Sequence, residues 1–104
     1  MPLLRLPSVD DVAELNRLHR AGLYLDAFHF AQRFAPPEDW RETQAVVLAG
    51  RLLSCWGDWW RSNRCHRRAW DSAPEDPAAV YYYGLTIEQK HGPFEALRFL
   101  RERR

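Results

Sequence analysis

The feature that most constrains the fold of this chain is a pair of glycines, Gly50 and Gly84, that lie 34 residues apart in the same apolar setting. The two matching segments are Val46-x-x-Ala49-Gly50-x-x-Leu53 and Val80-x-x-Tyr83-Gly84-x-x-Ile87. A period of 34 residues is the length of a two-helix unit in helical repeat proteins. The spacing therefore predicts a chain built from repeated helix pairs, a class that typically binds other proteins.

Prolines and glycines divide the chain into six apolar segments, and none of these shows the strict alternation of a strand. Helix-start signals precede three of them: Ser8 with Asp11, then Asp58, and Asp76 followed by Pro77. We expect an all-α fold of six helices. Their expected bounds are about 8–21, 23–34, 38 or 39–56, 59–73, 77–91 and 93 to the C-terminus.

Further residue pairs extend the repeat. At an offset of 34, Leu53 matches Ile87, Trp60 matches Phe94, Ser62 matches Ala96 and His66 matches Leu100. At an offset of 35, Leu18 matches Leu53, Gly22 matches Gly57, Leu25 matches Trp60 and Ala27 matches Ser62. We expect Gly50 and Gly84 to lie where the two helices of a unit cross. Ala27, Ser62 and Ala96 would be their small partners, and Trp60 would lie in the core.

This pattern resembles the tetratricopeptide repeat (TPR) family over nearly the whole chain. After an N-terminal extension over residues 1–7, a single domain over residues 8–104 divides into repeats at about 8–37, 38–75 and 76–104. The third repeat matches best, and the first is weak because Leu15 stands where the others have glycine. The resemblance implies a right-handed α-solenoid of antiparallel helix pairs, with a concave groove lined by the first helix of each pair.

On that resemblance, the chain is a protein-interaction module or scaffold whose groove holds a peptide or helix of a partner. Tyr81 is the favoured contact residue. The expected groove residues are Asn16, His19, Arg20, Arg51, Tyr81, Leu85 and Gln89. Some members of the family clamp the terminal carboxylate of chaperone tails; of the corresponding positions here only Asn16 fits, which argues against that ligand.

The C-terminal end suggests an alternative, a docking or oligomerisation arm of a larger protein. Helical repeat arrays normally finish with a helix whose outer face is polar, and no such helix follows the last predicted one. We expect exposed apolar side chains at this end and self-association through them, as a homodimer. The residues expected there are Tyr82, Leu97 and Leu100.

The charge balance weakens a third hypothesis, an RNA-contacting repeat. A stripe of Arg61, Arg64 and Arg68 interleaved with tryptophans is the feature that favours it. The chain has 15 basic and 14 acidic residues and a net charge of +1, whereas nucleic-acid-binding domains are clearly basic. We therefore do not expect a nucleic-acid partner.

Catalytic and metal motifs are not found. The sequence has no glycine-rich phosphate loop, nucleophile elbow or HExxH motif. Cys55, Cys65 and His66 do not have the spacing of a structural zinc site, and Cys65 falls at a core position. We expect no enzyme activity, no cofactor and no metal. With two cysteines and no apolar run long enough to span a bilayer, we expect a cytoplasmic protein without a membrane partner.

Overall fold

The fold, seen in a computed structural model that describes residues 4–102, is all-α. Those residues form six α-helices and a short 3-10 turn, with no strand among them. The helices are α1 (Val9–Arg20), α2 (Tyr24–Ala31), α3 (Thr43–Cys55), α4 (Trp59–Ser72), α5 (Pro77–His91) and α6 (Pro93–Arg101), and the 3-10 turn is η1 (Pro37–Asp39). Residues 1–3 of the predicted extension and residues 103–104 of the predicted third repeat lie outside the described residues.

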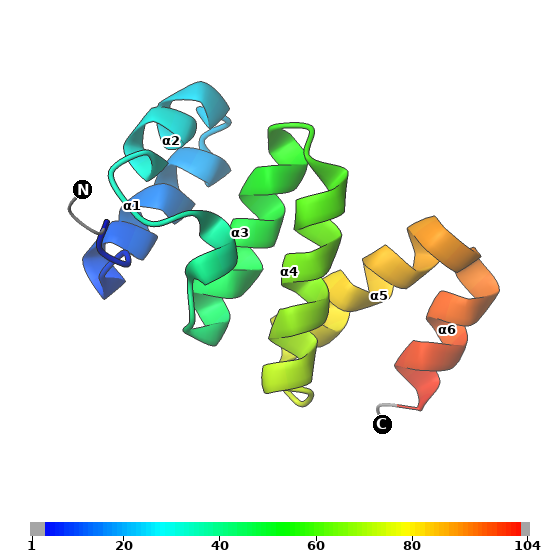
Figure 1. Cartoon of the computed structure of the whole chain (residues 1–104). Helices are drawn as coiled ribbons and strands as arrows, with labels where there is room; N and C mark the ends of the chain where they lie inside the picture. The colour runs from blue at the N-terminus through cyan, green and yellow to red at the C-terminus, as the bar shows by residue number, and fades with distance from the viewer. Residues whose placement is uncertain (1–3, 103–104) are drawn as a thin grey trace.

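Helices that follow one another in the sequence pack side by side (Figure 1). The helix pairs α1 with α2, α3 with α4 and α5 with α6 are in contact, and so are α4 and α5. Helix α3 contacts α1, α2 and α5, so it lies at the centre of an elongated body of 44 × 24 × 24 Å.

The turn inside each pair carries one glycine with a positive φ. These angles are 76° at Gly22, 85° at Gly57 and 89° at Gly92. A left-handed backbone conformation favours glycine, so the three turns are built in the same way. The predicted helix breaks at the three positions are confirmed.

The predicted helix starts are confirmed where a side chain caps the helix. Ser8 accepts from the backbone N–H of Asp11 at 3.2 Å, and the Asp11 carboxylate accepts from the backbone N–H of Ser8 at 2.9 Å. Asp58 and Asp76 accept from the backbone N–H groups of Arg61 and Ala79. These bonds satisfy amide donors that the first turn of a helix leaves unpaired.

Two boundaries near the middle of the chain differ from the prediction. Helix α2 ends at Ala31, before the expected Phe34, and α3 begins at Thr43, after the expected 38 or 39. The reason lies at Trp40, whose backbone is extended and whose fully buried indole donates to the carbonyl of Ala35 at 2.8 Å. Burying this large side chain between the first two helix pairs holds the connection out of helical geometry.

The predicted close crossing of α3 and α4 at Gly50 is confirmed. A Cβ atom built on Gly50 would lie 2.4 Å from Cε1 of His66, and the hydroxyl of Ser62 donates to the Gly50 carbonyl at 2.7 Å. Gly84 lies against α6 in the same way, since a Cβ there would lie 3.3 Å from Cδ2 of Leu100. Both glycines therefore occupy the contact between the helices of a pair.

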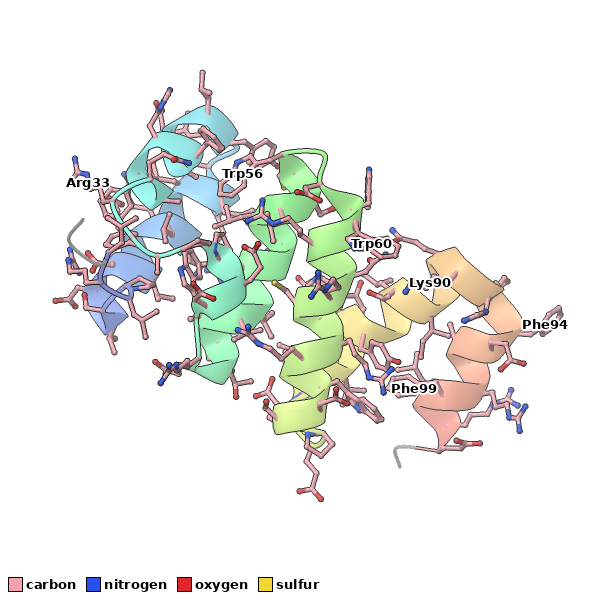
Figure 2. All side chains as sticks on the ribbon, in the orientation of Figure 1. Arg33, Trp56, Trp60, Lys90, Phe94 and Phe99 are labelled. Carbon is pink, nitrogen blue, oxygen red and sulfur yellow. The ribbon has the colours of Figure 1, made fainter. Side chains whose placement is uncertain are left out.

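The prediction that Trp60 lies in the core is wrong. Its side chain is 74% exposed, and its counterpart Phe94 is 85% exposed; Figure 2 shows Phe94 projecting from the edge of the molecule. The buried face of α4 carries Ser62, Cys65, His66 and Ala69, which follow helical spacing. Trp60 stands two residues before Ser62, about 200° around the helix axis, and so faces outward.

Three further tryptophans, Trp56, Trp59 and Trp70, divide into two groups. Trp56 lies between α2 and α3, where its indole donates to the Tyr24 carbonyl at 2.9 Å and its ring meets Phe28 edge-on (Figure 2). Trp70 stacks on Tyr83 of α5, with ring centroids 4.9 Å apart. Trp59, by contrast, is 54% exposed. Two of the three therefore join neighbouring helix pairs.

Candidate partner-binding groove

Side chains from all three helix pairs line one open hollow of about 300 Å³, which we call the central groove. Helix α1 contributes one residue, and α3, α4 and α5 contribute the rest. The lining residues are His19, Arg51, Ser54, Cys55, Trp59, Ser62, Asn63, His66, Tyr82, Leu85, Thr86 and Gln89. The groove therefore depends on the packing of non-consecutive helices as well as on each pair.

Arg51 connects the walls of the groove. Its Nη2 lies 3.3 Å from Nδ1 of His19, and its guanidinium carbon lies 5.2 Å from the centroid of the Tyr82 ring. The second contact is a cation–π interaction, which places the guanidinium over the aromatic face. Burial, and then the charges of Arg51 and Arg20, lower the pKa of His19, so this imidazole is neutral at pH 7.

His66 forms the floor of the groove, against Gly50. The imidazole is 6% exposed and stacks on Tyr82 with centroids 5.3 Å apart and planes 14° apart. Burial and, secondarily, the charge of Arg51 lower its pKa to about 4. Its Nδ1 atom is buried without a hydrogen-bond partner in residues 4–102. This nitrogen faces the helix crossing, since a Cβ atom built on Gly50 would lie 2.7 Å from it.

Four of the predicted groove residues lie together in the central groove: His19, Arg51, Leu85 and Gln89. Asn16 is half-buried on α1 and Arg20 is exposed on the same helix, and neither lines the hollow. Arg20 is still close enough to act on the imidazole of His19.

The two adjacent tyrosines have exchanged their expected places. Tyr82, predicted at the exposed C-terminal end, is partly buried between His66 and Arg51 in the groove. Tyr81, predicted in the groove, is 56% exposed and lines a different hollow together with Leu100. Neighbouring helical residues point about 100° apart, so a modest change in the orientation of α5 decides which of the two faces inward.

Sequence reasoning missed the contribution of α4 to the groove. The resemblance assigned the lining to the first helix of each pair, yet Trp59, Asn63 and His66 of the second helix take part. One signal for this was present in the sequence. His66 occupies a position where the repeat pattern calls for a large apolar side chain, and such a departure marks a polar group in the interior.

A second candidate surface lies toward the C-terminal end of the chain. We call it the C-terminal patch, and it consists of Tyr81, Phe94, Leu97 and Leu100. Phe94 and Leu97 line one shallow hollow, Tyr81 and Leu100 line another, and Glu102 borders both. The exposed fractions of Leu97 and Leu100 are 48% and 39%. The patch matches the predicted self-association end in Leu97 and Leu100, with Tyr82 replaced by Tyr81 and Phe94.

The arginine stripe on α4 is largely engaged within the chain. Arg61 pairs with Glu38, and its Nε lies 2.8 Å from Oε2 of that residue. Arg68 donates to the carbonyls of Glu38 and Trp40. Two of the three guanidinium groups thus fasten α4 to the segment before α3, which leaves less of the stripe for a nucleic acid.

The two cysteines differ in burial. Cys65 is buried, as expected for a core position, and burial raises the pKa of its thiol; Cys55 is exposed. In residues 4–102 no group of three or more His, Cys, Asp or Glu side chains is arranged to hold a metal ion. None of the helices in the described part of the chain has the length and apolar character needed to cross a membrane.

Comparison with known proteins finds no matching family model, no similar curated protein and no similar solved structure. The likeness to tetratricopeptide repeats therefore rests on the residues quoted above.

Proposed function

We propose that this chain is a protein-interaction module of the tetratricopeptide type, a right-handed solenoid that holds a peptide or helix of a partner in the central groove. The observation that carries the proposal is that side chains from all three helix pairs converge on one hollow. Its walls combine apolar area, at Trp59, Leu85 and Tyr82, with a few polar groups. That mixture is typical of sites that hold a peptide segment.

The test is a selection from a library of random 12-residue peptides displayed on phage. Enriched peptides would be synthesised and their affinities measured for the wild-type chain and for Leu85→Glu, which places a charge in the groove. We expect the substitution to weaken binding roughly tenfold or more, since it sets an unpaired carboxylate against apolar ligand surface. Leu25→Glu is the matched control, because Leu25 is 68% exposed on α2 and does not line the groove. Peptides that bind both variants equally would refute the proposal.

A second candidate function is docking or self-association through the C-terminal patch, as an arm of a larger assembly. Phe94 at 85% exposure is the observation that favours it, since aromatic side chains left this open are common at protein interfaces. The two functions use different surfaces, so one chain can carry both. RNA binding through α4 is the weakest candidate, given the internal pairing of Arg61 and Arg68.

A further inference from the structure

The charged side chains that line the central groove are of one sign, which is positive. Arg51 is the only arginine or lysine among its lining residues, and no aspartate or glutamate of the described chain lines it. Arg51 also takes part in none of the ion pairs that the structure describes in residues 4–102. On the neighbouring helix α4, by contrast, Arg61 pairs with Glu38 and Arg67 pairs with Asp71. The groove thus holds a positive charge without its counterion.

The guanidinium of Arg51 has N–H donors available for an acceptor. Of its five N–H donors, one approaches His19 and the others have no partner in the described residues. The Tyr82 ring supports it from one side. A guanidinium with free N–H donors can make the paired, planar contact that a carboxylate accepts.

His66 adds a second polar side chain at the floor of the groove. It is 6% exposed, it lines the groove, and its Nδ1 has no hydrogen-bond partner in the described residues. That nitrogen faces Gly50 in the helix crossing, where a Cβ atom would lie 2.7 Å from it. The His66 ring stacks on the same tyrosine ring that supports Arg51, so Tyr82 connects the two side chains.

We infer that the partner segment held in the central groove presents an acidic side chain, aspartate or glutamate, whose carboxylate pairs with Arg51. This inference rests on the proposed function of the groove. The side-chain amides of Asn63 and Gln89 offer further donors at the rim, and Trp59 and Leu85 contact the apolar residues beside the acid. The recognised chemistry is a carboxylate flanked by apolar side chains on a peptide.

The experiment uses the strongest peptide from the phage selection, synthesised with an amidated C-terminus so that only side chains carry a carboxylate. In a matched set of peptides, each Asp is replaced by Asn and each Glu by Gln, one at a time. We expect one replacement to weaken binding to the wild-type chain roughly tenfold to a hundredfold, the range for losing a charged hydrogen bond. In the variant Arg51→Gln, the acidic and amide peptides should bind equally.

Two further variants separate charge from shape. Arg51→Lys keeps the charge but loses the planar fork, so we expect it to retain only part of the preference for the acid. Arg41→Gln removes an exposed arginine outside the groove and should leave the preference intact. If Arg51→Gln lost its helical circular dichroism signal, the test would rest on Arg51→Lys. A preference for the acidic peptide that was unchanged in Arg51→Lys would then overturn the paired contact.

The outcomes distinguish this inference from the proposed function. Peptides that depend on Leu85 but bind equally as acid and amide would refute acid recognition and leave the groove as a binding site. If Arg51→Gln still bound the acidic peptide more tightly than its amide counterpart, the carboxylate would lie elsewhere. That result would also overturn the inference. Peptides that do not depend on Leu85 at all would refute both.

Discussion

At the scale of single residues, the contact between Gly50 and His66 sets how closely α3 and α4 approach. A methyl group on Gly50 would overlap a rigid, buried imidazole, whereas on Gly84 it would meet the end of Leu100, a flexible and 39% exposed side chain. Gly50 therefore faces a rigid side chain, and Gly84 faces a flexible one. Neither has a positive φ, so backbone strain does not enter the comparison.

We expect Gly50→Ala to lower the free energy of unfolding by about 1–3 kcal/mol, through forced displacement of His66. Gly84→Ala should be neutral or stabilising by up to ~1 kcal/mol, because alanine favours the helix and Leu100 can move. Urea denaturation of both variants measures the difference. Adding His66→Ala should remove most of the cost of Gly50→Ala; a cost that remained in full would rule out this contact as its source.

The buried His66 also predicts how stability changes with pH. Its pKa is about 4 in the folded chain and 6.5 without the fold, so the unfolded state binds the proton more readily. The stabilisation is complete above pH 6.5 and is lost as the pH falls toward 4. By linkage, the loss attributable to this group is roughly 3 kcal/mol at most.

Urea denaturation at several pH values between 7 and 4 checks this prediction. The variant His66→Gln should lose less stability over that interval than the wild-type chain, and the exposed His29→Gln should behave like the wild type. If the free energy of unfolding changed with pH in parallel for the wild type and His66→Gln, another group would control the pH dependence. His19, whose pKa is also lowered, would be the next residue to replace.

At the scale of helices, the start of α5 is held by one side chain that also reaches across to α3. Asp76 accepts from the backbone N–H of Ala79 at 3.0 Å and from Nε2 of Gln44 at 3.1 Å. Pro77 follows at the first helical position. This cap fixes where α5 begins and so contributes to the placement of Tyr82 in the groove.

We expect Asp76→Ala to destabilise the fold by about 1 kcal/mol, the usual cost of losing a helix cap. Asp76→Asn should retain most of the stability, because its side-chain oxygen can still accept from Ala79. Thermal unfolding followed by circular dichroism compares the two. An Asn variant as unstable as the Ala variant would indicate that charge, and not capping, is what Asp76 contributes.

At the scale of the whole molecule, both ends of the elongated body expose apolar side chains. Helix α6 exposes Phe94, Leu97 and part of Leu100, and α2 exposes Tyr24, Leu25 and Phe28. Under the second candidate function, the C-terminal patch joins two copies of the chain. The apolar area would then be removed from water in the dimer.

We expect the wild-type chain to self-associate as its concentration rises and Leu97→Glu to remain monomeric with unchanged helicity. Light scattering across a concentration series measures the absolute mass of each. Leu25→Glu is the matched control and should still associate. If Leu25→Glu gave the monomer and Leu97→Glu did not, the interface would lie at α2.

Local features of this fold followed from the sequence because they depend on neighbouring residues. Ser8, Asp58 and Asp76 cap helices through bonds to amides three residues away, and the turn at Gly57 needs only its own backbone freedom. The spacing of Gly50 and Gly84 predicted the close helix crossings for a similar reason, since a missing side chain leaves room for whatever helix packs there.

The orientation of each helix about its own axis was decided only by tertiary packing. Periodicity relates residues of one helix to each other, but the direction of its buried face depends on how the helix pairs cross. For this reason Tyr82 and not Tyr81 enters the groove, and α4 contributes His66 beside Arg51. The sequence by itself therefore determined six helices and their contacts within pairs, while the packing of the pairs against one another created the central groove.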